Sequence, residues 1–126
     1  MLRIVKFIKD NYPSSKIHNT MNHANKNMSA FMWNWENETH SIAHGILDDI
    51  TYDWFKIIQG MFKTGGVSVI VSEENLLTAN KKALDSTNIK ADHTGTSGFA
   101  GYLELIKLVY LDKNDKAGVF FTGAIR

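Results

Sequence analysis

Apolar residues recur at steps of three and four over residues 40–62, and this is the strongest pattern in the chain. They are Ile42, Ala43, Ile46, Leu47, Ile50, Trp54, Ile57, Ile58 and Met61. Such spacing is typical of an amphipathic α-helix. Thr39 is a suitable N-cap, and the pair Gly65-Gly66 is a suitable C-terminal stop. We therefore predict one long helix over 40–62.

Three further stretches show weaker helical spacing. The first covers residues 2–10, where a strand is also possible, and ends before Pro13, which breaks the pattern. The second covers about residues 20–35, although many asparagines in its first half favour caps and turns. The third follows Ser72, which is a good N-cap with two glutamates directly after it, and continues to about residue 86.

Three segments have the composition of β-strands. Residues 67–71 read Val-Ser-Val-Ile-Val, and residues 102–111 and 117–125 are rich in aliphatic and aromatic residues. A polar turn over 112–116 joins the last two as an antiparallel hairpin. We therefore expect an α+β fold, in which N-terminal helices pack on a small antiparallel sheet that ends in a C-terminal hairpin. The length predicts a single domain over residues 1–126.

Composition places the chain among globular proteins. It has 126 residues, 44% hydrophobic and 21% charged, with a formal net charge of +1. A disordered segment would be less apolar and more highly charged. The absence of cysteine excludes a disulfide scaffold, a thiolate zinc site and a cysteine nucleophile. No uncharged apolar stretch reaches about 18 residues, so we expect no membrane span. We expect a soluble, cytoplasmic protein, and the composition also fits secretion.

The small net charge hides an uneven distribution. Residues 1–27 carry five basic side chains and one acidic, whereas residues 36–53 carry five acidic side chains and no lysine or arginine. Two oppositely charged surfaces that attract each other are the simpler interpretation. The alternative is a basic arm that binds an anionic partner, with RNA as one candidate.

A pair of histidines suggests a metal site. His40 and His44 lie four residues apart on the helix predicted over 40–62, and Asp48 lies one turn further along. Imidazoles at this spacing can bind one metal ion from one helix face. The simpler interpretation is a solvent-exposed helix face without a ligand, because the glutamate that follows the first histidine in the common zinc motif is missing.

A second group of residues has the side-chain types that metal-independent RNA cleavage requires. That reaction needs a general base, a general acid and a cation that stabilises the charged phosphorane. His93 is a candidate base, Tyr110 a candidate acid, and Lys107 and Arg126 are candidate cations. On a regular strand Lys107 and Tyr110 would face opposite sides, which counts against their acting together.

Aromatic residues cluster over 31–35, where Phe31, Trp33 and Trp35 occupy every second position. One helix cannot bury both tryptophans on the same face. We therefore expect one of them to face solvent, a partner or another element of the protein. The simpler interpretation is that helices on both sides cover this cluster. The alternative is a binding surface, because an exposed tryptophan is a typical binding anchor.

Three functional hypotheses follow from these patterns. The first is a small binding module, for example an inhibitor or an accessory protein, that contacts another protein through Phe31, Trp33 and Trp35. The second is a toxin-like ribonuclease that uses His93, Tyr110 and Lys107 or Arg126. The third is a metal-binding protein that uses His40, His44 and Asp48. No cofactor motif is present, and the sequence leaves the oligomeric state and the question of catalysis open.

Overall fold

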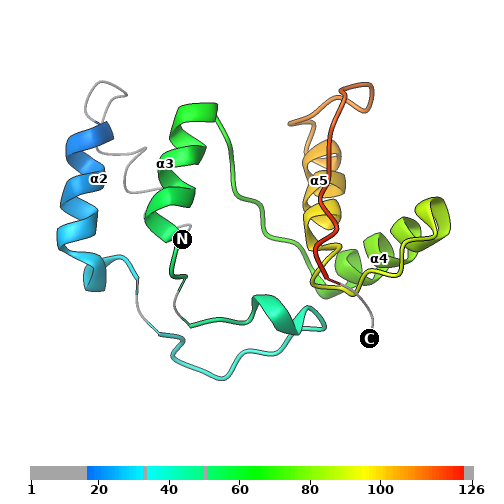
Figure 1. Cartoon of the computed structure of the whole chain (residues 1–126), viewed down its shortest axis with the longest axis horizontal. Coiled ribbons are helices and arrows are strands. Elements are labelled where there is room, and N and C mark those ends of the chain that lie inside the picture. Colours follow the sequence, from blue (N-terminus) through cyan, green and yellow to red (C-terminus); the bar gives the residue numbers. More distant parts are fainter. Residues whose placement is uncertain (1–16, 33, 50, 124–126) are drawn as a thin grey trace. The chain divides into compact units, whose positions relative to one another are not determined.

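The computed structural model describes residues 17–32, 34–49 and 51–123 (Figure 1). The chain divides into two compact units. Unit 1 contains Met1–Glu38 and Asp48–Ser68, and unit 2 contains Thr39–Leu47 and Val69–Arg126. Each unit is therefore assembled from two separate stretches of the chain.

Unit 1 is built around two helices, α2 (Ile17–Lys26) and α3 (Trp54–Thr64), with the short 3-10 helix η2 (Met28–Ala30) after α2. Each α-helix buries one face. Met21 and Ala24 of α2 and Trp54 and Ile58 of α3 form its buried core. The partly buried side chains around that core are Met28, Phe31, Met32, Phe55, Met61 and Phe62.

The C-terminus of α3 is where the sequence places it. Gly65 has a φ of 70°, and its backbone N–H donates to the carbonyl of Met61. Glycine adopts this left-handed conformation without a steric penalty, so it ends helices readily. The expected stop at Gly65-Gly66 is therefore confirmed.

Unit 2 is built around α4 (Glu73–Thr87) and α5 (Ser97–Lys107), which pack against each other. The Ser72 hydroxyl caps α4 by accepting the backbone N–H of Asn75 at 3.2 Å. Asn88 ends α4 with a φ of 58°, a left-handed conformation that asparagine tolerates. The helix predicted over 72–86 is confirmed.

The core of unit 2 contains small side chains, which let its backbone segments approach closely. Its buried members are Ala43, Leu76, Ala79 and Ala100. Ala43 comes from the segment 39–47, which contains the short 3-10 helix η3 (His44–Ile46). Hydrogen bonds attach this segment to the rest of the unit. The backbone N–H of Ile42 donates to the Glu73 carboxylate at 2.9 Å, and that of Gly45 donates to the Thr94 hydroxyl at 3.0 Å.

Hydrogen bonds from α4 fix the connection 88–96 between the two helices. The side-chain amide of Asn80 donates to the backbone carbonyl of Ala91 at 2.9 Å and to the hydroxyl of Thr96 at 3.1 Å. Thr96 is buried, and no buried side-chain polar atom lacks a hydrogen-bond partner within the described residues. This connection therefore places the start of α5 firmly against α4.

Beyond α5 the chain reverses direction and runs back along that helix (Figure 1). The reversal is a turn in which the Asp115 carboxylate accepts the backbone N–H of Asp112 at 2.9 Å. On the return, the ring of Phe121 meets the ring of Phe99 edge-on at 6.3 Å between centroids. We call residues 117–123 the return segment.

The expectation of an α+β fold is wrong. Across residues 17–32, 34–49 and 51–123 the structure contains four α-helices, two short 3-10 helices and no strand. The predicted strand over 102–111 is mostly α5. Phe99 and Leu103 recur at helical spacing, and both pack against the unit 2 core. The segments 67–71 and 117–123 are non-helical, but neither is a paired strand, so the predicted hairpin is absent from the described residues.

The long helix predicted over 40–62 is also interrupted. Among the described α-helices only α3 overlaps this range, and residues 39–47, which contain η3, instead form the irregular segment that docks in unit 2. The apolar spacing of residues 42–47 reflects burial of Ala43 against α4 and α5 rather than one face of a helix. The helix predicted over 20–35 is shorter, because α2 ends at Lys26. The helix predicted over 2–10 lies outside the described residues.

Candidate functional site

The chain exposes three successive large apolar side chains directly after α5. Leu108 is 61% exposed, Val109 is 88% exposed and Tyr110 is 58% exposed. We call these three residues the apolar turn. An isolated exposed apolar side chain is ordinary in a globular protein, but neighbouring ones form a patch of the kind that binds partners.

The backbone of the apolar turn is held by hydrogen bonds to the last turn of α5. The backbone N–H of Val109 donates to the carbonyl of Ile106 at 2.9 Å, and that of Tyr110 donates to the carbonyl of Leu105 at 2.9 Å. This pair of bonds is the Schellman arrangement, in which the position that Val109 occupies is usually a glycine in the left-handed conformation. The apolar turn therefore has a defined backbone.

Valine occupies the position where glycine is preferred. Val109 has a φ of 57°, which is an outlier for a β-branched residue. This conformation costs about 1–2 kcal/mol. The Val109 side chain is almost fully in solvent, so burial does not offset that cost. Strained residues of this kind concentrate at functional positions, which singles out Val109.

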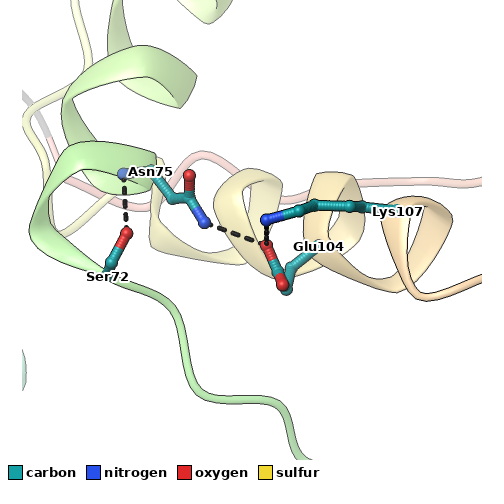
Figure 2. Close-up of polar contacts among 4 residues, drawn as sticks. All are labelled: Ser72, Asn75, Glu104 and Lys107. Atoms are coloured by element: carbon teal, nitrogen blue, oxygen red, sulfur yellow. Dashed lines mark hydrogen bonds and ion pairs between the residues drawn. The ribbon is translucent and has the colours of Figure 1, made fainter.

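Polar contacts between α4 and α5 fix the helix that carries the apolar turn (Figure 2). The side-chain amide of Asn75 donates to the Glu104 carboxylate at 2.9 Å. The ammonium nitrogen of Lys107 is 3.6 Å from the same carboxylate oxygen, Oε2 of Glu104. The Lys107 ammonium is therefore partly neutralised by Glu104.

The structure does not bring the residues of the ribonuclease hypothesis together. His93 lies on the connection before α5, whereas Lys107 is its last residue and Tyr110 lies beyond its end. Eleven helical residues span about 16 Å, so His93 cannot share one phosphate with Lys107 or Tyr110. Arg126 lies outside the described residues.

The residues of the metal hypothesis do not share a helix. His40 precedes η3 and His44 begins it, both in unit 2 and both exposed, whereas Asp48 belongs to unit 1. Within the described residues, no group of three or more histidine, aspartate or glutamate side chains is arranged to hold a metal ion. The spacing that suggested the site depended on a helix that is not formed there.

One of the same histidines instead lies near a carboxylate that holds the segment 39–47. The backbone N–H of Ile42 and the hydroxyl of Ser41 stabilise the Glu73 carboxylate and lower the pKa of Glu73 below 4.5. His44 and His93 add a smaller electrostatic contribution in the same direction, and partial desolvation opposes it. This contact anchors the segment 39–47, and because it uses a carboxylate we expect the docking of the segment to depend on pH.

We expect this docking to weaken in acid. The pKa of Glu73 is lower in the folded protein, so its contribution to stability is present above pH 4.5 and is lost as pH falls through the folded pKa. The amide resonance of Ile42 should therefore titrate below pH 4.5. In a Glu73→Gln variant the same resonance should not titrate in that range. Identical titration curves in the two proteins would contradict the anchoring role of Glu73.

The aromatic residues of the binding hypothesis lie in unit 1, as far as they are described. Phe31 is half-buried against the unit 1 core, where the edge of the His23 ring meets it at 6.3 Å. Trp35 is 59% exposed, and its indole N–H donates to the Asp48 carbonyl at 3.3 Å. The expectation that one tryptophan faces solvent is confirmed for Trp35. Trp33 lies outside the described residues.

Sequence reasoning missed Leu108 and Val109 and considered Tyr110 only as an acid. A signal was present. Phe99, Leu103 and Ile106 follow helical steps of four and three, and a helix that ends near residue 107 leaves the next three apolar residues beyond its packed face. The β-type composition of residues 102–111 hid this spacing.

Comparisons with protein-family models, curated proteins and solved structures find no match to this chain. The described helices are too short or too polar to cross a lipid bilayer.

Proposed function

We propose that this chain is a small protein-binding module whose contact surface is the apolar turn Leu108–Tyr110. The observation that carries the proposal is the combination of high exposure and backbone strain at Val109. A glycine there would relieve the strain, so the valine side chain is explained best by a contact outside the chain. Apolar and aromatic anchors held in one conformation bind with a small entropy cost.

Further exposed apolar side chains support a binding role. Among the described residues, twelve large hydrophobic side chains are exposed, including Trp35 and Tyr52 in unit 1. Exposed Trp and Tyr side chains are frequent at protein interfaces. We therefore include Trp35 in this proposal as an additional anchor. We also propose a cytoplasmic location.

The proposal does not extend to RNA cleavage or metal binding. His93 lies on the connection before α5 and Lys107 is the last residue of that helix, where it is paired with Glu104. His40 and His44 have no third ligand beside them within the described part of the chain. These two hypotheses stay predictions from the sequence without a supporting arrangement of side chains.

The test is quantitative capture of proteins from a lysate of the source cells by the tagged full chain and its variants. We expect Tyr110→Ser to reduce the captured amount of a specific partner about tenfold or more. We expect Val109→Gly to reduce capture as well, while it raises the free energy of unfolding by up to about 1 kcal/mol, because the strain is removed. If Val109→Gly binds less although it is more stable, the loss of binding is not caused by unfolding.

The matched control is Ile89→Ser, because Ile89 is 52% exposed in unit 2 and lies outside the apolar turn. Capture by this variant should equal capture by the unchanged chain. Equal capture by all four proteins would overturn the proposal, and so would a loss of capture with Ile89→Ser as large as that with Tyr110→Ser.

A further inference from the structure

The return segment has the side-chain pattern of a β-strand. Val119, Phe121 and Gly123 are partly buried, whereas Phe120 and Thr122 are exposed. Burial therefore alternates with every residue from Gly118 to Gly123, which is the period of a strand that packs one face. The buried face lies on α5, where Phe121 contacts Phe99 and Val119 approaches Gly98.

The backbone groups of the return segment are the second observation. No backbone N–H or carbonyl of residues 117–123 takes part in a backbone–backbone hydrogen bond within the described residues. Valine, phenylalanine and threonine favour the extended conformation, and an extended backbone carries alternating donors and acceptors. The ligand that matches such a row is another extended peptide.

Phe120 is the second unexplained feature of this segment. Its side chain is 89% exposed, which is the highest exposure among the large apolar residues of the described chain. It lies on the face opposite to α5, so packing within unit 2 gives no reason for a phenylalanine there. A contact with another molecule would give one.

We propose that two copies of this chain pair through their return segments as antiparallel strands, with Phe120 of each copy opposite Phe120 of the other. In this register Val119 lies opposite Phe121 on the face that packs on α5. The two exposed phenylalanines form a cross-strand aromatic pair on the other face. Residues 117–123 contain no charged side chain, so the pairing places no like charges opposite each other. This surface is distinct from the apolar turn.

The register can be tested by a charge exchange at residue 120. We prepare Phe120→Asp and Phe120→Lys in the full chain and measure molecular mass against concentration by sedimentation equilibrium. The unchanged chain should dimerise. Each variant alone should have a dimer dissociation constant about ten- to hundredfold higher, because the aromatic pair is replaced by two like charges.

An equimolar mixture of the two variants should recover dimers, because aspartate then lies opposite lysine. This recovery also shows that both variants are folded. The matched control is Ile70→Asp, because Ile70 is 74% exposed in unit 2 and should not change the dissociation constant. A monomeric unchanged chain at every concentration would overturn the proposal, and so would a mixture that dimerises no better than its components. Neither result affects capture through Leu108–Tyr110, because that test uses other variants.

Discussion

Replacement of Ile58 by alanine is expected to lower the free energy of unfolding of unit 1 by about 2–5 kcal/mol. Ile58 is fully buried, and it lies in the core with Met21, Ala24 and Trp54. The substitution removes three carbon atoms from a packed core and leaves a cavity that the neighbours fill only in part. Urea unfolding followed by tryptophan fluorescence measures this loss, because the sequence of unit 2 contains no tryptophan.

The neighbouring residue supplies the control for this experiment. Ile57 is 41% exposed on the same helix, so Ile57→Ala changes helix propensity and hydrophobicity in a similar way without opening a core cavity. We expect its effect to be well under half of that of Ile58→Ala. Equal effects of the two substitutions would show that α3 buries a different face.

A single methyl group at Gly95 is expected to displace the return segment from α5. A Cβ atom at Gly95 would lie 2.7 Å from the carbonyl oxygen and 2.8 Å from the Cα of Gly123. These atoms belong to the backbone, so a side-chain rotation cannot relieve the clash. We expect Gly95→Ala to destabilise unit 2 by about 1–3 kcal/mol, as other overpacked sites do. Trypsin should then cleave faster after Lys116, which directly precedes the return segment.

Gly60→Ala is the control for added volume. No atom lies within 4 Å of a Cβ placed at Gly60, and this glycine lies in α3. Alanine should therefore stabilise the helix by up to about 1 kcal/mol and leave cleavage after Lys116 unchanged. Unchanged cleavage in Gly95→Ala would mean that the return segment does not pack on this glycine.

The sequence predicted those elements whose boundaries are fixed by local chemistry. α4 is the clearest case, because the Ser72 cap and the first-turn glutamates act within one helical turn. The end of α3 at Gly65 is another, since a left-handed φ depends on the residue itself. Signals of this kind can be read without knowledge of the rest of the chain.

The prediction from sequence was wrong where the apolar residues of a short segment fit both the helical and the strand period. Residues 102–111 have the composition of a strand, but Leu103 also lies at helical spacing from Phe99, and the two pack together on the core. Glu104 and Lys107 form an ion pair across one helical turn, which a strand could not make on one face. Packing against α4 favours the helix, and the composition of the segment does not reveal that contact.

The candidate site was predicted less well than the fold elements, because exposure depends on distant contacts. Trp35 is exposed as expected, but the expectation assumed one helix through residue 35, whereas α2 ends at Lys26. The exposure of Leu108–Tyr110 depends on where α5 ends, and the docking of Ala43 depends on two helices more than 30 residues further along the chain. Single-sequence patterns carry no information on such long-range partners.

The interleaved division of the chain has a consequence for the order of folding. Unit 2 needs the segment 39–47, but its hydrogen-bond partners Glu73 and Thr94 follow Ile42 and Gly45 by 31 and 49 residues. During synthesis this segment leaves the ribosome well before its partners, and Ala43 stays without its core until α5 has been made. Contacts of such long sequence separation slow folding, because a large loop must close first. A fragment that begins at Val69 would lack Ala43, and Leu76, Ala79 and Ala100 would lose part of their cover.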